Sequence, residues 1–421
     1  MLPLKALSAL LLAVPVVTAV RGFNYGSTFT DGRPKTLADY QAEFTAANTL
    51  EGSDGAFTSA RLYTMIQAGS TNDPISAIPA AIATRTSLLL GLWASAGDAS
   101  FAHELEALRK TIEQYPQLAG LIDGISVGSE DLYRLSPMGV AAGQYAGAEP
   151  STLVKYITQV RALIKDTPFA HAPIGHVDTW TAWGNKTNGV VVENCDWIGM
   201  DAYPYFDDFA PNHISDAPDR FADGLGKTLA AAGKDTQVWI TETGWPVSGK
   251  KVGKAVASPE NAKLYWDSVG CSLFKNNTHV WWYTFQDSAP TTPVPSFGII
   301  GSSLTNKPLW DLSCPEEPKA SSAPVAIAKT ASPYSQVSVA AKASPAPAPA
   351  SASAGGAIYG DAGSGHNATR TPSVLASPSL IGTGSGRNAT ATATPGVVTA
   401  GSVKTSFTFI TILGMMAVAL F

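Results

Sequence analysis

The chain has 421 residues and a formal net charge of −5, with 45% hydrophobic and only 14% charged residues. An average soluble chain carries about 25% charged residues, and this acidic balance excludes a broad basic surface for nucleic acid. All ten tryptophans lie between Trp93 and Trp310, so we predict one large folded domain over residues 20–316.

Residues 1–19 have the pattern of a secretory signal peptide. Lys5 is the only charged residue, an apolar run covers residues 10–17, and the small residues up to Ala19 suit a cleavage site. The run is shorter than the about 20 residues that a membrane-spanning helix needs. We therefore expect secretion, and a membrane anchor or a buried helix is the less favoured alternative.

The predicted domain alternates short apolar runs with longer amphipathic stretches. Apolar residues at three- and four-residue spacing predict helices over 102–115 and 151–164, and Ser258-Pro259 is typical of a helix start. Strands are predicted near residues 22–26, 60–64, 88–93, 124–130, 174–180, 197–203, 238–242 and 280–285. Eight such units in about 300 residues predict an α/β fold, the (β/α)₈ TIM barrel. The alternative, a doubly wound sheet, would need a glycine-rich phosphate loop after the first strand, and residues 22–26 do not form one.

Cysteine and asparagine patterns agree with an extracellular chain. Cys195, Cys271 and Cys314 suit an oxidising compartment, and a Cys271–Cys314 bridge would fix the end of the domain, although the sequence leaves the pairing open. The cysteine and histidine spacing offers no local zinc cluster, so no metal is expected. Asn-x-Ser/Thr acceptors predict glycosylation at four positions: Asn185, Asn276, Asn367 and Asn388.

The C-terminal quarter differs in composition. Residues 317–400 are rich in Ser, Thr, Ala and Pro. A segment of this composition can bury too little apolar surface to offset its conformational entropy, so we predict a disordered, O-glycosylated stalk. Residues 401–421 end in an uncharged apolar run that begins at Phe407. Small residues, a polar spacer and this run predict a GPI-attachment signal, with the lipid on Ala400 or Gly401 within a window over 396–402. A tail-anchored helix is the alternative.

Two glutamates end otherwise apolar predicted strands. Glu130 closes the fourth strand in Val-Gly-Ser-Glu, and Glu242 ends the seventh in Thr-Glu-Thr-Gly-Trp-Pro. The carboxyl ends of barrel strands share one rim, where catalytic residues of barrel enzymes lie. Paired carboxylates at such a rim suit glycoside hydrolysis, with one protonated and one ionised. The alternative is a structural, salt-bridged role for both, and three aspartates near strand ends compete for the catalytic roles: Asp178, Asp201 and Asp287.

Aromatic residues gather at or near the predicted strand ends, where their faces could stack on sugar rings. They are Trp180, Trp183, Tyr203, Tyr205, Trp245, Trp281, Trp282 and Tyr283. Our substrate-binding candidates are Tyr25, Tyr203, Trp245 and Trp282. Alternate residues of a strand face opposite sides, and the sequence leaves open which of Trp281 and Trp282 points inward.

Four motifs resemble glycoside hydrolase family 17, above all its fungal lipid-anchored glucan endo-1,3-β-glucosidases. They are Val-Gly-Ser-Glu (127–130), Gly-Met-Asp-Ala-Tyr-Pro-Tyr (199–205), Trp-Ile-Thr-Glu-Thr-Gly-Trp-Pro (239–246) and Ser-Phe-Gly-Ile (296–299). The resemblance covers about residues 21–314. It implies a retaining, cofactor-free, monomeric hydrolase of cell-wall β-1,3-glucan, with Glu130 as proton donor and Glu242 as nucleophile. Many members have Asn before the acid, whereas this chain has Ser129, so altered sugar contacts are expected.

Two classes of function fit these features. The first is an endo-β-1,3-glucanase that acts in cell-wall organisation, with glucanosyl transfer as a possible outcome when a second glucan intercepts the covalent intermediate. The second is a catalytically silent glucan-binding or structural wall mannoprotein. Because both glutamates of the carboxylate pair are present, the sequence favours the enzyme.

Overall fold

The computed structural model describes residues 19–144 and 146–314. The expectations for the signal peptide, the stalk, the GPI signal with Ala400 and Gly401, and the acceptors Asn367 and Asn388 lie outside the described residues. Among the described residues, no helix is long and apolar enough to cross a membrane.

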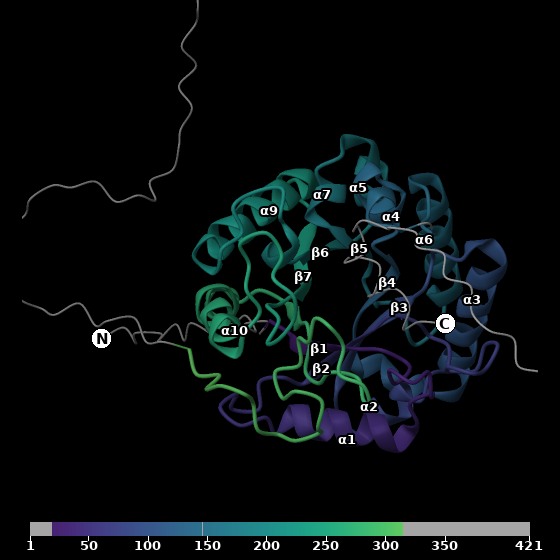
Figure 1. Cartoon of the computed structure of the whole chain (residues 1–421). Helices are drawn as coiled ribbons and strands as arrows, with labels where there is room; N and C mark the ends of the chain where they lie inside the picture. The colour runs from purple at the N-terminus through teal and green to yellow at the C-terminus, as the bar shows by residue number, and fades with distance from the viewer. Residues whose placement is uncertain (1–18, 145, 315–421) are drawn as a thin grey trace, which may run out of the picture. The chain divides into compact units, whose positions relative to one another are not determined.

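Eight parallel strands form a closed barrel in sequence order, and the last strand pairs with the first (Figure 1). The strands are β1 (Arg21–Tyr25), β2 (Ser59–Leu62), β3 (Ser87–Leu92), β4 (Ile122–Ser129), β5 (Ile174–Thr179), β6 (Trp197–Ala202), β7 (Gln237–Thr243) and β8 (Val280–Trp282). Each overlaps one of the eight predicted strands, and the helices surround them. The (β/α)₈ barrel prediction is confirmed.

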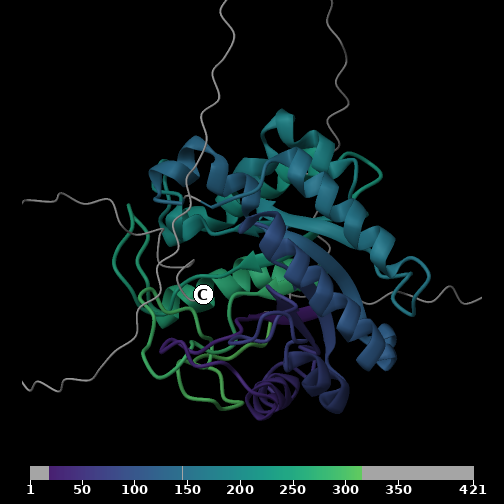
Figure 2. The same ribbon diagram turned by 90° about the vertical axis from the view of Figure 1, so that its right-hand side faces the viewer.

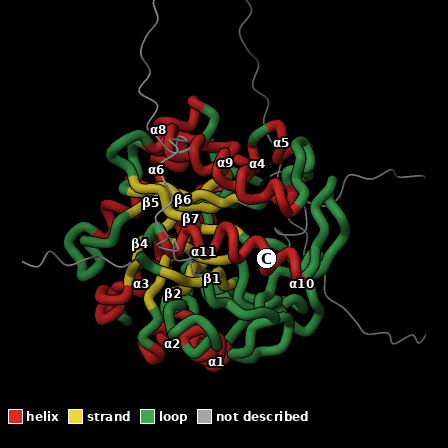
Figure 3. Tube along the Cα trace, turned by 90° about the vertical axis from the view of Figure 1, so that its left-hand side faces the viewer, coloured by secondary structure: helices red, strands yellow, loops and turns green. Residues whose placement is uncertain are grey.

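The helices lie outside the strands, as the tube view shows with helices in red and strands in yellow (Figure 3). The α-helices are α1 (Leu37–Asn48), α2 (Ala77–Thr84), α3 (Gly97–Gln114), α4 (Asp131–Leu135), α5 (Pro137–Ala141), α6 (Pro150–Ile164), α7 (Trp180–Trp183), α8 (Gly189–Val192), α9 (Ala217–Ala232), α10 (Pro259–Tyr265) and α11 (Cys271–Lys275). Shorter turns are η1 (Pro116–Leu121), η2 (Lys186–Asn188), η3 (Pro204–Phe206), η4 (Ile214–Asp216) and the π turn η5 (Trp266–Gly270).

The predicted helix signals have the expected local causes. In α6, Pro150 occupies the first turn, and the apolar residues recur on one buried face that includes Leu153, Ile157 and Val160. Helix α10 begins after Ser258, whose Oγ accepts a hydrogen bond from the backbone N–H of Asn261 at 3.1 Å. The three- and four-residue spacing therefore identified both the helix and its inward face.

Two separate apolar clusters divide the interior. The larger one fills the space between the strands and the outer helices. The smaller one fills the inside of the barrel and consists of Leu89, Val177, Trp197, Trp239 and Trp281. The rings of Trp197 and Trp239 stack with centroids 4.1 Å apart. Seen from the side in Figure 2, the strands run through the interior with helices on both flanks.

A disulfide joins Cys271 in α11 to Cys314, across 43 residues of sequence, with Cα atoms 5.4 Å apart. Of the described cysteines, Cys195 is free. The bridge that the sequence left open is therefore present, and it ties the end of the described domain to the helix before β8. A closed loop of this length stabilises a fold mainly by restricting the unfolded chain.

Candidate active site

Glu242 lies at the carboxyl end of β7 and accepts hydrogen bonds from three side chains. Arg61 Nη1 donates to its Oε1 at 2.6 Å, and the Tyr63 hydroxyl donates to the same oxygen at 2.7 Å. The Tyr203 hydroxyl donates to Oε2 at 2.6 Å. Three donors, one of them cationic, stabilise the ionised form of a carboxyl group. The surroundings of Glu242 therefore hold it as a carboxylate.

Arg61 connects three strands beneath this carboxylate. Its side chain is only 1% exposed, and besides Glu242 it donates to Asn24 Oδ1 on β1 at 2.8 Å and to Ser129 Oγ on β4 at 3.0 Å. Burial lowers the pKa of Arg61, but the charges of Asp201 and Glu242 outweigh burial and raise it. The guanidinium therefore stays charged although it is buried.

Glu130 follows β4 and caps the N-terminus of α4, with its backbone in the left-handed region at φ 57°. Its side chain is 27% exposed, and its Oε2 lies 3.7 Å from Arg134 Nη2. Burial raises the pKa of Glu130 to about 7, and the negative charges of Glu242 and Asp178 add to this effect, whereas the cations Arg134 and Arg61 oppose it. At neutral pH a large share of Glu130 is therefore protonated.

The two glutamates differ in charge state because their surroundings differ. Glu242 has a buried cation and two hydroxyls as donors, whereas Glu130 is partly buried, has one cation at 3.7 Å and faces the charge of Glu242. Two carboxyl groups whose environments push their proton affinities apart can act as an acid and a nucleophile or base. Glu242 therefore does form the salt bridge that a structural role would require. Glu130 differs, because a protonated carboxyl group carries no charge for an ion pair.

The three competing aspartates are buried and engaged in the protein. Asp178 accepts hydrogen bonds from backbone N–H groups of α4, and Asp287 accepts from Ser296 Oγ and the N–H groups of the loop that follows it. Asp201 lies next to Glu242 in the sheet register, accepts from Thr241 Oγ1 at 2.6 Å, and has its pKa raised by burial and by the charge of Glu242. The three aspartates therefore hold neighbouring backbone and side-chain groups of the site in place through hydrogen bonds.

Of the four aromatic candidates, the structure brings one to the glutamates, since Tyr203 bonds to Glu242. The other three lie away from the two carboxylates, and their role toward a sugar stays a prediction. Tyr25 is buried and packs edge-on against Phe44 of α1, Trp282 is buried against Trp266, and Trp245 is buried with its Nε1 donating to the carbonyl of Val256. Side chains alternate along a strand, and these residues face the outer helices or their loops.

The open choice within the last strand is resolved. Trp281 points into the barrel with the interior cluster, and Trp282 points outward. Tyr283 then returns to the inner side, where its ring packs edge-on against those of Tyr203 and Phe297. The aromatics around Glu242 are therefore tyrosines and one phenylalanine, whereas on the side of Glu130 the ring of Trp93 packs on Arg134 at 4.7 Å.

Sequence reasoning missed Arg61 and Tyr63. Both lie on the inner face of the β2 segment, two residues apart, and both reach Glu242. A signal was available, because a charged residue within an apolar strand needs a partner in the same way as the two glutamates did. The partner could not be identified because β2 and β7 are far apart in the sequence.

The two described glycosylation acceptors, Asn185 and Asn276, are both exposed. Asn185 Oδ1 accepts hydrogen bonds from Thr187, which leaves the amide nitrogen toward solvent. Within residues 19–144 and 146–314, no cluster of three or more His, Cys, Asp or Glu residues is arranged to hold a metal ion.

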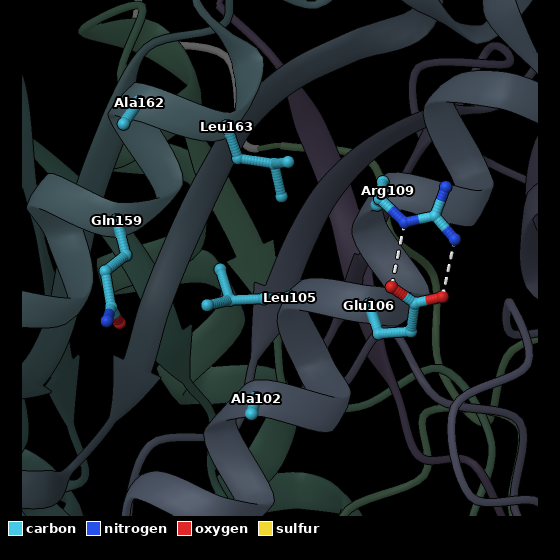
Figure 4. A pocket seen from close by; sticks show the side chains of 7 residues that line it. All are labelled: Ala102, Leu105, Glu106, Arg109, Gln159, Ala162 and Leu163. Carbon is cyan, nitrogen blue, oxygen red and sulfur yellow. Dashed lines mark hydrogen bonds and ion pairs between the residues drawn. The ribbon is translucent and has the colours of Figure 1, made fainter.

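A surface groove of about 470 Å³ lies elsewhere, between α3 and α6 (Figure 4). Its lining is mostly apolar, with one paired charge, as Arg109 Nε donates to Glu106 Oε2 at 2.8 Å and Nη2 to Oε1 at 2.6 Å. Helices α3 and α6 cover the outside of the barrel, so this groove is separate from the carboxylates at the strand ends.

Comparisons with known proteins show the family of the chain. The model of the BtgE/BtgC glycoside hydrolase domain matches residues 22–298. The chain belongs to the BtgE/BtgC glycoside hydrolase family. This assignment confirms the resemblance that the four sequence motifs carried, and the barrel is that of a glycoside hydrolase.

Relatives of this glycoside hydrolase include two fungal proteins named probable glucan endo-1,3-beta-glucosidase. The protein from Aspergillus fumigatus is 57% identical over 310 residues, which cover 73% of this chain and 68% of that one. The protein from Aspergillus oryzae is 56% identical over 297 residues, 70% of this chain and 63% of that one. The chain thus matches about two thirds of the length of these relatives.

A solved structure shares the fold. It is a glycoside hydrolase family 17 β-1,3-glucanosyltransferase from Rhizomucor miehei, with 24% identity, a TM-score of 0.56, and coverage of 70% of this chain and 98% of that one. An active-site mutant of the Rhizomucor enzyme, solved in complex with laminaritriose, gives 23% identity and a TM-score of 0.57.

Because the pKa of Glu130 is raised, we expect the stability of the fold to depend on pH. The pKa of Glu130 is about 7 in the folded chain and about 4.3 in the unfolded chain. Between these pH values the native state therefore binds more protons than the unfolded state. The free energy of unfolding therefore falls as the pH rises through this window. We expect the parent chain to lose about 3 kcal/mol more stability than Glu130→Gln between about pH 4.5 and pH 8, as measured by urea unfolding.

The matched control is Glu51→Gln, because Glu51 is an exposed glutamate. This variant should follow the stability of the parent chain at both pH values. If the pH dependence of Glu130→Gln also equals that of the parent chain, Glu130 has an ordinary carboxyl titration and the protonated state inferred here is wrong.

Proposed function

We propose that the chain is a retaining endo-β-1,3-glucanase in which Glu130 is the acid and base and Glu242 is the nucleophile. The observation that carries the proposal is the contrast between the surroundings of these two glutamates, at the ends of β4 and β7. Glu242 is held ionised by three donors, and the pKa of Glu130 is raised to about 7. A protonated and an ionised carboxyl group are the pair that glycoside hydrolysis uses.

In the first step, Glu130 donates its proton to the glycosidic oxygen, and the bond from that oxygen to the anomeric carbon breaks. The carboxylate of Glu242 forms a bond to the same carbon from the opposite face. The products are the leaving chain, with a new hydroxyl, and a glucosyl ester on Glu242. Arg61, Tyr63 and Tyr203 orient the carboxylate for this attack through the hydrogen bonds that they donate.

In the second step, water attacks the anomeric carbon and gives a proton to Glu130 as the ester bond to Glu242 breaks. Glu242 carries no charge while it is esterified. Because that charge contributes to the raised pKa of Glu130, its loss lowers the pKa and favours the ionised, basic form. The loss of charge on Glu242 therefore allows Glu130 to act first as an acid and then as a base.

The substrate assignment rests on the relatives. Two proteins that are 56–57% identical to this chain are named as probable glucan endo-1,3-beta-glucosidases, and the Rhizomucor enzyme of the same fold was solved with laminaritriose. The motif from Thr241 to Pro246 that encloses Glu242, and the tyrosines around it, fit a sugar-binding rim. We therefore take linear β-1,3-glucan as the substrate class.

The decisive experiment follows the products from a defined linear β-1,3-glucan oligomer by proton NMR. We expect reducing sugar that appears first as the β-anomer, because two displacements at one carbon preserve its configuration. Glu242→Gln should abolish release. Initial α-anomer would contradict retention, binding of the oligomer without release would support a silent binding protein, and products longer than the substrate would identify a glucanosyltransferase.

The acid role makes a separate prediction. Glu130→Gln should slow hydrolysis of natural β-1,3-linkages by about 10²–10⁴-fold, because their leaving groups need a proton. The same variant should cleave activated aryl β-glycosides, whose leaving groups need no proton, at close to the parent rate for the first step. Burst kinetics on both substrates measure this difference. An equal loss on both would show that Glu130 is not the acid.

We also propose that the enzyme is secreted and held at the membrane or wall by a GPI anchor, near β-1,3-glucan. The sequence of residues 1–19 and 401–421 supports this placement. A phosphatidylinositol-specific phospholipase should release active enzyme from cell membranes, whereas a chain that stops after Cys314 should be secreted without attachment. Recovery of the intact 407–421 peptide from the membrane-bound protein would contradict the anchor and indicate a tail-anchored helix.

A further inference from the structure

Three ionisable side chains lie buried directly behind Glu130, and we call them the subjacent cluster: Asp131, His176 and Asp178. All three are 0% exposed. They come from α4 and β5, the elements that follow Glu130 and flank its strand. Buried charges are costly unless they are paired, so each needs a physical reason.

Asp178 holds the turn on the C-terminal side of Glu130. Its Oδ2 accepts from the backbone N–H of Leu132 at 2.8 Å, and its Oδ1 accepts from Tyr133 N–H at 3.2 Å and Thr179 N–H at 2.8 Å. The first two donors belong to the opening turn of α4, where N–H groups have no helical partner. Asp178 therefore fixes the start of the helix that Glu130 caps.

Asp131 holds the backbone on the N-terminal side of Glu130. Its Oδ2 accepts from the backbone N–H of Ser129 at 2.8 Å, its Oδ1 accepts from Ser95 Oγ at 2.6 Å, and Arg134 donates to the carbonyl of Ser129. Glu130 therefore sits between two residues whose backbone is tied to buried side chains. Its left-handed backbone is costly for a residue with a side chain, and these bonds maintain it.

The charge state of His176 follows from its neighbours. Its Nδ1 lies 2.7 Å from the carbonyl oxygen of Val127, and its Nε2 lies 3.1 Å from Asp178 Oδ2. A carbonyl can only accept, and Asp178 already accepts from three N–H groups, so it acts as a carboxylate here. With Asp178 ionised, both ring nitrogens donate, and the ring is then the doubly protonated imidazolium.

We propose that His176 is a buried imidazolium that, with Asp178, positions Glu130 and sets the pH at which it gives up its proton. The pair touches neither substrate nor the reacting atoms, so both are positioning residues. This inference rests on the proposed function in one respect only, that Glu130 is the acid. The charge and geometry of the pair do not depend on that role.

The charged and titratable groups around the pair and around Glu130 come from several elements. His176 faces Asp178 on its own strand and Asp131 on α4. Glu130 faces Arg134 on α4, Asp178 on β5, Glu242 on β7 and Arg61 on β2, and its charge helps to raise the pKa of Asp201 on β6. Within this set, the imidazolium neutralises part of the negative charge that Asp178 presents to Glu130.

Two substitutions should therefore shift Glu130 in opposite directions. Asp178→Asn keeps the size of the side chain but removes a negative charge, so the midpoint of Glu130 should move down by at least about 0.5 pH unit. His176→Gln keeps a donor toward Asp178 but removes the positive charge, so the midpoint should move up by a similar amount. A role confined to structure predicts lower stability in both variants and no opposite shifts.

The experiment uses the full chain with ¹³C-labelled glutamate carboxyl groups, and Glu130→Gln identifies the signal of Glu130. The titration of that signal and the alkaline limb of kcat/KM on a β-1,3-glucan oligomer are measured in the parent chain and both variants. The matched control is Asp123→Asn, which removes a half-buried aspartate that accepts from Ser59 and Ser87. It lies seven residues before Glu130, roughly 20 Å away along β4, and should change stability without moving the Glu130 midpoint.

Opposite shifts in the two variants support the proposal, and shifts in the same direction or no shifts in folded variants overturn it. If the carboxyl midpoint moves but the activity limb does not follow, the proposed acid role of Glu130 fails while the effect of the pair stands. Should either variant fail to fold, ¹⁵N-histidine NMR of the parent chain decides. His176 with a single protonated nitrogen at pH 7 would overturn the proposal.

Discussion

A buried guanidinium at the centre of the barrel governs the rest of the site. Arg61 is almost inaccessible, and it donates to side chains on β1, β4 and β7: Asn24, Ser129 and Glu242. A cation that loses its water is tolerated only when its donors are satisfied by well-placed acceptors. The requirement to pair Arg61 therefore fixes three strands relative to each other, and it fixes the nucleophile candidate in the same set of bonds.

This single cation also distributes the charge among the neighbouring acids. Glu242, Asp201 and Glu130 interact with one another and with Arg61, so they cannot all be ionised at low cost. Glu242 has the direct bond to the guanidinium and two tyrosine donors, and it keeps the charge. Burial, together with the charge of Glu242, raises the pKa of Asp201 and of Glu130, so the negative charge of the group stays on Glu242.

The sequence predicted those parts of the molecule that depend on local pattern. Runs of apolar residues identified the strands, and Glu130 and Glu242 stood out because a carboxylate at the end of an apolar strand needs a reason. The sequence did not show that Tyr25 and Trp282 point away from the barrel interior, because a period of two tells which residues share a face, but not which face points inward. Arg61 was missed because its partner lies 181 positions away and is brought to it only by closure of the barrel.

The alternation along β2 explains how one barrel holds both a dry interior and a charged rim. Ser59, Arg61 and Tyr63 share the inner face, and successive members are about 7 Å apart along the strand. Ser59 Oγ accepts from Trp281 Nε1 at 2.9 Å, within the tryptophan cluster that fills the barrel, whereas Tyr63 reaches Glu242 at the rim. Arg61 lies between them, so the tryptophans exclude water from below it. In that water-poor layer its bonds to Glu242 and Ser129 are stronger than they would be in solvent. The aromatic filling of the barrel therefore strengthens the bonds by which Arg61 holds Glu242 in place.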